Sequence, residues 1–391
     1  MRRAGDAGGL PLAADRLDDP ELVEAGDPGG MLRQVASAAA HVRIAVRAAQ
    51  EAGVAALSGD DRPRAIVVAG PGIAGDALEV LCGPSAPVQI VCVRGQRLPG
   101  WVGAADLVIV TAGGEAPASD PGADGPPVAE AVLSVAEQAM RRGCQMAGIG
   151  PVASPLRDLV RGPYIPAAPG LWQVLTGLLI IAEQLGIIEI GADGYEDAAA
   201  VLEDIAHRCR PVSESFVNPA KTLALDLVGA LPLVWGSRPL GGLAARRFGT
   251  MLNIVSKSPA QHGTLPEAVA DQAALFDGPF VPGPAPRFPS LEDPDEFELD
   301  DPQERTELRL VLLADPAAED ARLATLRGAV RDVADQRGIR VTELAAEGER
   351  PLRRLATLIQ LADYASVYLA IASGIDPSAA SAIGDVTERI V

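Results

Sequence analysis

The sequence predicts an α/β protein built from two doubly wound domains, each a parallel sheet flanked by helices. In both halves of the 391-residue chain, short apolar strands alternate with Gly-rich turns and amphipathic helices, which is typical of such sheets. Hydrophobic residues make up 48% of the chain, but aromatic residues only 3%. The cores must therefore consist mainly of Ala, Val, Leu and Ile, which suits parallel strands covered by helices on both faces.

The first half contains four predicted strands. A polar N-terminal arm precedes an Ala-rich stretch from Met31 to Gly53, which predicts a helix. The strands are AIVVA before Gly70, VQIVCV from Val88, DLVIV from Asp106, and CQMAGIG after the amphipathic helix VAEAVLSVAEQAMRRG. A long helical region, from Pro169 to Cys209, leads into the second half.

The second half repeats the alternation. Its predicted strands are LPLVWGS, RLVLLAD and IRVTELAA, with a helix from Ala321 to Arg337 before the third strand and a long apolar helix that ends at Gly374. Pro-rich and acidic residues fill 278–301, which predicts a surface loop. These elements divide the chain into an N-terminal arm at 1–30, a first domain at 31–168, a helical connection at 169–217 and a second domain at 218–391.

Composition narrows the range of partners. The formal net charge of −19 argues against nucleic acid and anionic membrane. The N-terminus has two Arg but no apolar segment behind them, so no signal peptide is expected. The most apolar run, Leu171 to Ile190, is broken by Glu183, Gln184 and Gly186, which predicts a buried helix followed by a strand or turn, not a membrane span.

Cofactor and metal signals are weak. The four cysteines have no metal-ligand spacing, which predicts reduced thiols in a cytoplasmic protein and no metal site. GPGIAG at Gly70 lacks the rest of a dinucleotide fingerprint, so no cofactor is expected. Lys221 and Lys257 are the only lysines, which limits any mechanism that needs an amine.

The stretch from Asn218 to Glu267 carries the most specific pattern. It reads NPAK, a strand ending in GS, AARRF, LN, K-PA and LPE in that order, and it resembles the bifunctional phosphoglucose/phosphomannose isomerases, members of the sugar isomerase (SIS) superfamily. Similar segments are DRLDDPELVEAGDPGGML, IVVAGPGIAGDAL, LGIIEIGADGYEDAAAVLE and ADYASVYLAIASGIDPSAASAI. The resemblance thus extends over nearly the whole chain and implies two SIS domains, a homodimer and a sugar phosphate ligand.

The same resemblance implies catalytic residues that this chain lacks. Converting an aldose phosphate to a ketose phosphate needs an acid/base for ring opening and a carboxylate that moves a proton between C2 and C1. Where the family has its proton-transfer Glu, its ring-opening His and its C-terminal Lys, this chain has Ile254, Ala270 and Thr387. We therefore expect isomerase activity to be lost or very weak.

The phosphate site implied by the family is also altered. Its Ser-rich loop is replaced by a segment with one hydroxyl, Thr111, and a carboxylate, Glu115, that would repel a phosphate. Gly170 stands where the family has an Arg before its long helix. The remaining candidate substrate contacts are Gly70, Gly72, Thr111, Gly113, Gly114, Ser237 and Arg247, with Ser237 as the preferred hydroxyl donor at a strand-to-helix turn.

Three functions remain open on this reading. The chain is a degenerate isomerase that binds a sugar phosphate or regulates carbohydrate metabolism, an active isomerase with a relocated set, or an interaction protein that uses the acidic loop. The relocated set would consist of Glu267, His262 and Lys257. As structural residues we expect Lys221 at a helix start, Trp235 between the domains and, if it is not catalytic, His262 in a loop.

Overall fold

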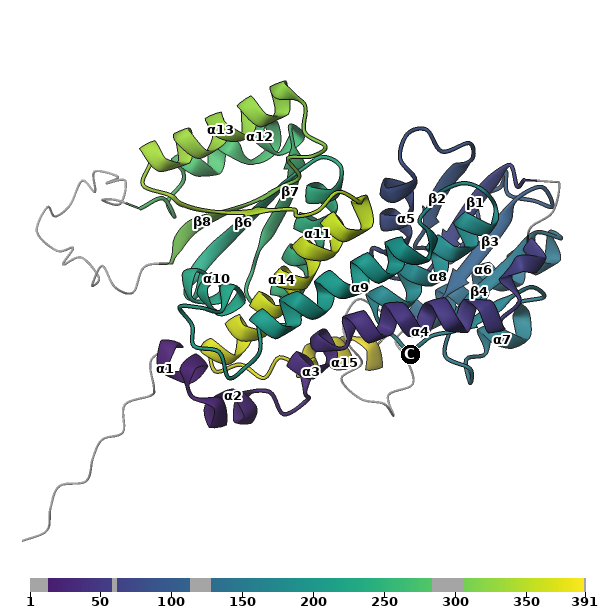
Figure 1. The fold of residues 1–391 in the computed structure, drawn as a ribbon, viewed down its shortest axis with the longest axis horizontal. Helices are drawn as coiled ribbons and strands as arrows, with labels where there is room; N and C mark the ends of the chain where they lie inside the picture. Colours follow the sequence, from purple (N-terminus) through teal and green to yellow (C-terminus); the bar gives the residue numbers. More distant parts are fainter. Residues whose placement is uncertain (1–12, 58–61, 113–127, 283–305, 390–391) are drawn as a thin grey trace, which may run out of the picture.

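The computed structural model describes residues 13–57, 62–112, 128–282 and 306–389. Two parallel sheets lie side by side, and each is flanked by helices (Figure 1). The prediction of a two-part α/β fold with doubly wound parallel sheets is confirmed.

The first sheet has five parallel strands in the order β2-β1-β3-β4-β5. They are β1 (Ala65–Ala69), β2 (Gln89–Val93), β3 (Leu107–Thr111), β4 (Gln145–Gly150) and β5 (Tyr164–Pro166). Side chains of β1 alternate between two cores: Ile66 and Val68 face one hydrophobic cluster, whereas Val67 and Ala69 face another. This period of two explains why a run of five buried apolar residues forms a strand covered on both faces.

Helices cover both faces of the first sheet. On one face lie α4 (Ala38–Glu51), α5 (Ala74–Cys82) and α8 (Leu171–Gln184), and on the other lie α6 (Val128–Arg141) and α7 (Leu156–Leu159). The strand order reverses at β1, because β2 lies on one side of β1 and β3 lies on the other. Ligands of open α/β sheets bind at the carboxyl ends of strands beside such a reversal.

The second sheet has four parallel strands in the order β7-β6-β8-β9. They are β6 (Ala230–Ser237), β7 (Gln261–Leu265), β8 (Glu307–Ala314) and β9 (Arg340–Ala345). One face packs on α10 (Pro219–Leu227), α11 (Leu240–Ile254) and α14 (Pro351–Ala372), and the other on α12 (Glu267–Gln272), η2 (Ala273–Asp277) and α13 (Ala321–Gln336) (Figure 1).

The position of Trp235 differs from the predicted one. It was expected between the two domains, but it lies inside the second unit, stacked on Phe276 with ring centroids 5.4 Å apart. Its Nε1 donates to Oε1 of Gln272 at 2.7 Å. The cause is strand alternation: Val234 points toward α11 and the shared core, so Trp235 must point to the opposite face.

Two strands and one helix break were not predicted. β5 has only three residues, and β7 (QHGTL) has no apolar run. The predicted helix from Met31 to Gly53 is divided into α3 (Met31–Ala36) and α4, with Ser37 between them. These features arise from sheet pairing and packing and not from a local pattern.

The two units are joined by helices. α9 (Gly191–Arg208) packs against α4 of the first unit and α14 of the second, and one hydrophobic cluster contains residues of both sheets. Within the described residues, α14 is the one helix long and apolar enough to cross a membrane, but 94% of its apolar window is buried in the protein. α14 is therefore the central helix of the shared core.

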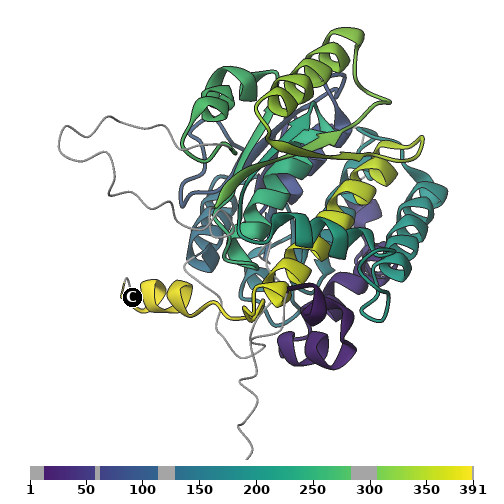
Figure 2. The same ribbon diagram turned by 90° about the vertical axis from the view of Figure 1, so that its left-hand side faces the viewer.

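Four short helical elements remain, three near the chain ends and one between α4 and β1. They are α1 (Ala13–Asp18), α2 (Pro20–Gly26), η1 (Val54–Leu57) and α15 (Ser381–Glu388). Figure 2 shows α15 extending away from the body of the molecule. Lys221 ties α10 to α1 and to the turn before α10. Its buried Nζ donates to the carbonyls of Leu17, Pro211 (2.7 Å) and Ser213 (2.7 Å).

Candidate functional site

Three of the predicted contact residues meet at the carboxyl edge of the first sheet. Gly70 follows β1, and Thr111 ends the neighbouring strand β3. A Cβ added to Gly70 would lie only 1.8 Å from Oγ1 of Thr111, so only glycine allows the two strands to pack this way. Thr111 is 2% exposed, and Gly72 has the left-handed φ of 81°. Gly113 and Gly114 lie outside the described residues.

Ser237 was the preferred ligand contact, and its position argues against that role. Its side chain is fully buried between β6 and β8. Its Oγ accepts from the backbone N–H of Asp315 at 2.9 Å and donates to the carbonyl of Leu313 at 3.4 Å. The hydroxyl thus joins two strand ends, because the turn after β6 brings it over the end of β8.

Arg247 is also bound within the protein. Its Nε and Nη2 donate to Oδ1 and Oδ2 of Asp363 at 3.0 and 2.9 Å. Both side chains are nearly inaccessible, with 4% and 8% exposure. A paired guanidinium of this kind compensates a buried carboxylate, so it offers little net positive charge to a ligand.

Arg246 points in a different direction from its neighbour, as adjacent helical residues must. It reaches across to the first unit, where its Nη1 donates to Oδ2 of Asp76 at 3.0 Å; Arg94 pairs with the same oxygen. Among the described residues, Asp76, Glu79 and Cys92 could share a metal ion, but two guanidiniums already occupy Asp76. Burial, then the Asp76 charge, raises the pKa of Cys92 to about 12, which also disfavours a thiolate ligand.

The three residues of the relocated set each have different partners. Glu267 forms an ion pair with Arg238. Lys257 donates from Nζ to the carbonyls of Asp376 (2.8 Å), Val255 (2.9 Å) and Pro377 (3.2 Å), and burial lowers its pKa. His262, expected in a loop, lies on β7 beside Gly249 of α11; burial, then the Arg246 charge, lowers its pKa.

The structure places the positions at which the family resemblance implies catalytic residues. Ile254 ends α11 and packs its half-buried side chain against the shared core. Ala270 is exposed on α12, and Thr387 belongs to α15, with its side chain outside the described residues. Gly170 precedes α8 with a φ of 142°, which side chains rarely adopt, so an Arg at this position would require a different backbone.

A cavity of about 240 Å³ lies close to Gly170, between the two units. We call it the interdomain cavity; α3, α4, the start of α8, α11 and α14 line it. Its polar lining is formed by Gln34, Ser37, His41, Arg247, Gln360 and Asp363. Burial lowers the pKa of His41, which disfavours the charged form of its imidazole.

Gln360 was missed by the sequence interpretation. It is 1% exposed, and its Nε2 donates to the carbonyl of Val35 at 2.8 Å, but its Oε1 has no hydrogen-bond partner in the described part of the chain. A signal was present: Gln360 and Asp363 lie one turn apart in the otherwise apolar helix LATLIQLADYASVYLAIA. Polar residues on the buried face of a core helix indicate an internal polar network or a ligand.

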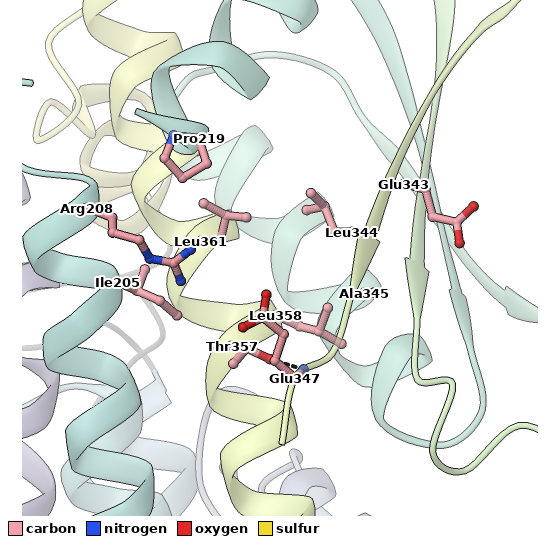
Figure 3. A pocket seen from close by; sticks show the side chains of 10 residues that line it. All are labelled: Ile205, Arg208, Pro219, Glu343, Leu344, Ala345, Glu347, Thr357, Leu358 and Leu361. Carbon is pink, nitrogen blue, oxygen red and sulfur yellow. Dashed lines mark hydrogen bonds between the residues drawn. The ribbon is translucent and has the colours of Figure 1, made fainter. Parts of the chain in front are cut away.

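A second cavity, of about 250 Å³, lies between α9, α10, α14 and the end of β9 (Figure 3). Several of its polar groups already have partners within the protein. Thr357 Oγ1 accepts from the N–H of Glu347 at 3.1 Å and donates to the carbonyl of Arg354 at 2.7 Å, and Arg208 pairs with Asp204 at 3.0 Å. None of the residues predicted from the sequence lines it, so the interdomain cavity is the better candidate site.

Sequence comparison identifies relatives of the second half most directly. Residues 216–390 match the model of the bacterial phospho-glucose isomerase C-terminal SIS domain. A bifunctional phosphoglucose/phosphomannose isomerase of Caldicellulosiruptor bescii is 27% identical over 201 residues, which are 51% of this chain and 52% of the relative. One from Aquifex aeolicus is 26% identical over 211 residues, 54% of this chain and 56% of the relative. The chain thus spans about half the length of the curated relatives that it matches.

Solved structures share the fold over most of the chain. A glucose-6-phosphate isomerase like protein from Thermus thermophilus superposes with a TM-score of 0.53 at 18% identity, covering 95% of this chain and 98% of the other. The C-terminal domain of glucosamine-fructose-6-phosphate aminotransferase from Francisella tularensis gives 0.57 at 13% identity, covering 90% and 98%. Residues 216–390 are thus similar to the C-terminal SIS domain of bacterial phospho-glucose isomerases, and most of the chain shares the fold of these solved structures.

Proposed function

We propose that this protein is a catalytically degenerate SIS-domain protein that binds a carbohydrate derivative in the interdomain cavity and acts as a sensor or regulator, not as an isomerase. The observation that carries the proposal is Ile254. At the place where the family implies a carboxylate that transfers a proton, α11 has an aliphatic side chain packed into the core. An aliphatic side chain cannot exchange a proton.

The cavity supports this proposal because it offers no replacement for the missing carboxylate among the described residues. Asp363 is the one carboxylate in its lining, and both of its oxygens accept from Arg247. A general base must have an oxygen within hydrogen-bond reach of the substrate proton, and at Asp363 a substrate would have to share oxygens that already accept from a guanidinium. His41 could assist ring opening, but that step alone does not interconvert an aldose and a ketose.

The alternative is an active isomerase that uses Glu267, His262 and Lys257. Its weakness is the surroundings of these residues: an ion pair holds Glu267, and three carbonyls hold Lys257. Catalysis tolerates little displacement of reacting groups, so these partners would have to be released together. The interaction-protein alternative depends on the acidic loop, of which only 278–282 is described.

A coupled assay with glucose 6-phosphate and mannose 6-phosphate, in both directions and at high enzyme concentration, tests the proposal. We expect rates equal to the blank. Turnover that co-purifies with the protein and disappears in Glu267→Gln or His262→Ala would establish a relocated site and overturn the proposal. A homodimer in the cytoplasm remains part of the proposal, and sedimentation velocity would test the dimer directly.

A further inference from the structure

We propose that the ligand of the interdomain cavity is uncharged and rich in hydroxyl groups: a free sugar or sugar alcohol without a phosphate group. This inference rests on the proposed function, since it specifies the class of carbohydrate that the cavity binds. Three features of the lining support it: an unpartnered acceptor, an uncapped helix start and a balanced charge.

The unpartnered acceptor is Oε1 of Gln360. A buried amide oxygen without a donor costs about 1–3 kcal/mol, so a bound group that donates a hydrogen bond would remove that cost. The opposite end of the amide is fixed, because Nε2 donates to the carbonyl of Val35. A ligand group that meets this oxygen must donate, as a hydroxyl does; a phosphate dianion cannot bind here, so this contact calls for a hydroxyl-bearing ligand and the charge of the lining decides whether it is phosphorylated.

The uncapped helix start is that of α8, a helix of 14 residues. No side chain caps it, and its first residues, Leu171 and Trp172, line the cavity. The first amides of a helix lack intrahelical acceptors and donate to a ligand oxygen. The cavity thus has a helix start at one wall and an acceptor at another, and a hydroxyl group can serve both because it donates and accepts.

The charge of the lining is balanced. Among the described residues that line the cavity, Arg247 and Asp363 are the charged pair, and they bind each other through two hydrogen bonds. Burial lowers the pKa of His41, which disfavours a positive charge on this side chain. A phosphate dianion in this cavity would lose its hydration without gaining an uncompensated cation, whereas a neutral ligand avoids that cost.

The size of the cavity agrees with a small polar ligand. Its volume of about 240 Å³ lies below the roughly 300–1,000 Å³ of sites for drug-sized molecules. Trp172, 5% exposed, adds an apolar surface to the lining, against which the carbon face of a sugar ring can pack.

Titration calorimetry with two matched panels tests the inference. The first panel is glucose, mannose, fructose and sorbitol, and the second is the 6-phosphates of the three sugars. We expect at least one member of the first panel to bind at least tenfold more tightly than any phosphorylated counterpart. Raising the salt concentration about tenfold should leave this binding unchanged, because screening acts on charged ligands.

Two variants test whether the ligand binds at Gln360. Gln360→Met removes the acceptor in a side chain of similar length, and we expect about tenfold weaker binding of the neutral ligand. The control is Ser366→Ala, a buried polar residue on the same helix whose Oγ bonds Ala362 within α14 at 2.9 Å and which does not line the cavity. Thermal unfolding of each variant shows whether it is folded, and the comparison of the two panels on the unsubstituted protein does not depend on either variant.

The outcomes separate the two proposals. Tighter binding of the phosphorylated sugars would overturn the inference and leave the proposed carbohydrate-binding role intact. No binding from either panel would overturn the inference and the proposed binding role together, and an undiminished affinity in Gln360→Met would place the ligand elsewhere. Isomerase turnover is a separate measurement, and it alone decides whether the chain is catalytically degenerate.

Discussion

A buried ion pair, Arg247 and Asp363, lies at the wall of the interdomain cavity, and a second one joins Arg354 to Asp315. Such a pair adds little net stability, but removal of one partner leaves the other charge buried and uncompensated. The pair of Arg247 and Asp363 therefore fixes where α11 and α14 meet more than it stabilises the fold.

Substitution of one partner should therefore be much more harmful than substitution of both. We expect Arg247→Met and Asp363→Leu each to lower the free energy of unfolding by about 3 kcal/mol, and the double variant to lose less than either single variant. Urea denaturation measures all three. Arg246→Met, which breaks a partly exposed ion pair with Asp76, is the control and should cost about 1 kcal/mol or less. Additive losses in the double variant would contradict the assignment of a coupled buried pair.

Histidine burial predicts a pH dependence of stability. Burial lowers the pKa of the half-buried His41 below the ordinary value of 6.5. Between the folded pKa and 6.5 the unfolded chain binds more protons, so stability is fully present above 6.5 and is lost as the pH falls toward the folded pKa.

Urea midpoints measured at pH 7.5 and 5.5 (about one unit on either side of that value) test this sign. The unfolding free energy should fall at the lower pH, and His41→Gln should reduce the fall. His207→Gln, at an exposed position on α9, is the matched control and should leave the fall as it is. A midpoint that rises on acidification, or an unchanged fall in His41→Gln, would show that the fold does not lower the pKa of His41.

At the scale of elements, the contact of α11 with the second sheet depends on glycine. A Cβ on Gly241 would lie 2.3 Å from the carbonyl oxygen of Leu313 in β8, a backbone atom that cannot move aside alone. We expect Gly241→Ala to lower the unfolding free energy by about 1–3 kcal/mol, the usual cost of overpacking.

Gly328 in α13 provides the control, since nothing lies within 4 Å of a Cβ added there. Gly328→Ala should stabilise the protein by about 0.5–1 kcal/mol, because alanine loses less conformational freedom in a helix than glycine does. Thermal unfolding of the two variants should therefore give shifts of opposite sign. A tolerated Gly241→Ala would mean that α11 does not pack closely on β8.

The local pattern of each strand decided whether the sequence could predict it. Strands such as Ala65–Ala69 and Glu307–Ala314 are apolar and buried, so their local pattern identified them. β7 is a polar edge strand and β5 has three residues, so both depend on a partner strand that no local pattern reveals.

The candidate site was less predictable than the fold. The family resemblance implies a carboxylate at Ile254, and its loss stays a prediction. Ser237 and Arg247 were predicted as ligand contacts from their local positions, but the protein itself binds both side chains. Hydrogen bonds of this kind depend on which strand ends and helices meet in three dimensions. Gln360 was missed for the same reason, because its importance comes from an empty acceptor and not from a motif.

At the scale of the whole molecule, the two sheets share one core. A single hydrophobic cluster contains Ile109 of β3, Val311 of β8 and Leu355 of α14. α9 is tied to α14 by the hydroxyl of Tyr368, which donates to the carbonyl of Cys209 at 2.6 Å. Separation of the halves would expose much of this cluster, so neither sheet has an independent core on this side.

This shared core predicts cooperative unfolding. Differential scanning calorimetry of the whole chain should show one transition, with a van't Hoff enthalpy close to the calorimetric enthalpy, because a boundary that runs through a core cannot open first at low cost.

The shared core also predicts that residues 218–391 expressed alone do not form a stable domain, since the apolar face of α14 would lose α9 and its other partners. Two resolved transitions, or a folded C-terminal half, would instead mean that the sheets are separate folding units. In that case ligand binding between them would be expected to change their relative position and not simply to fill a rigid cavity.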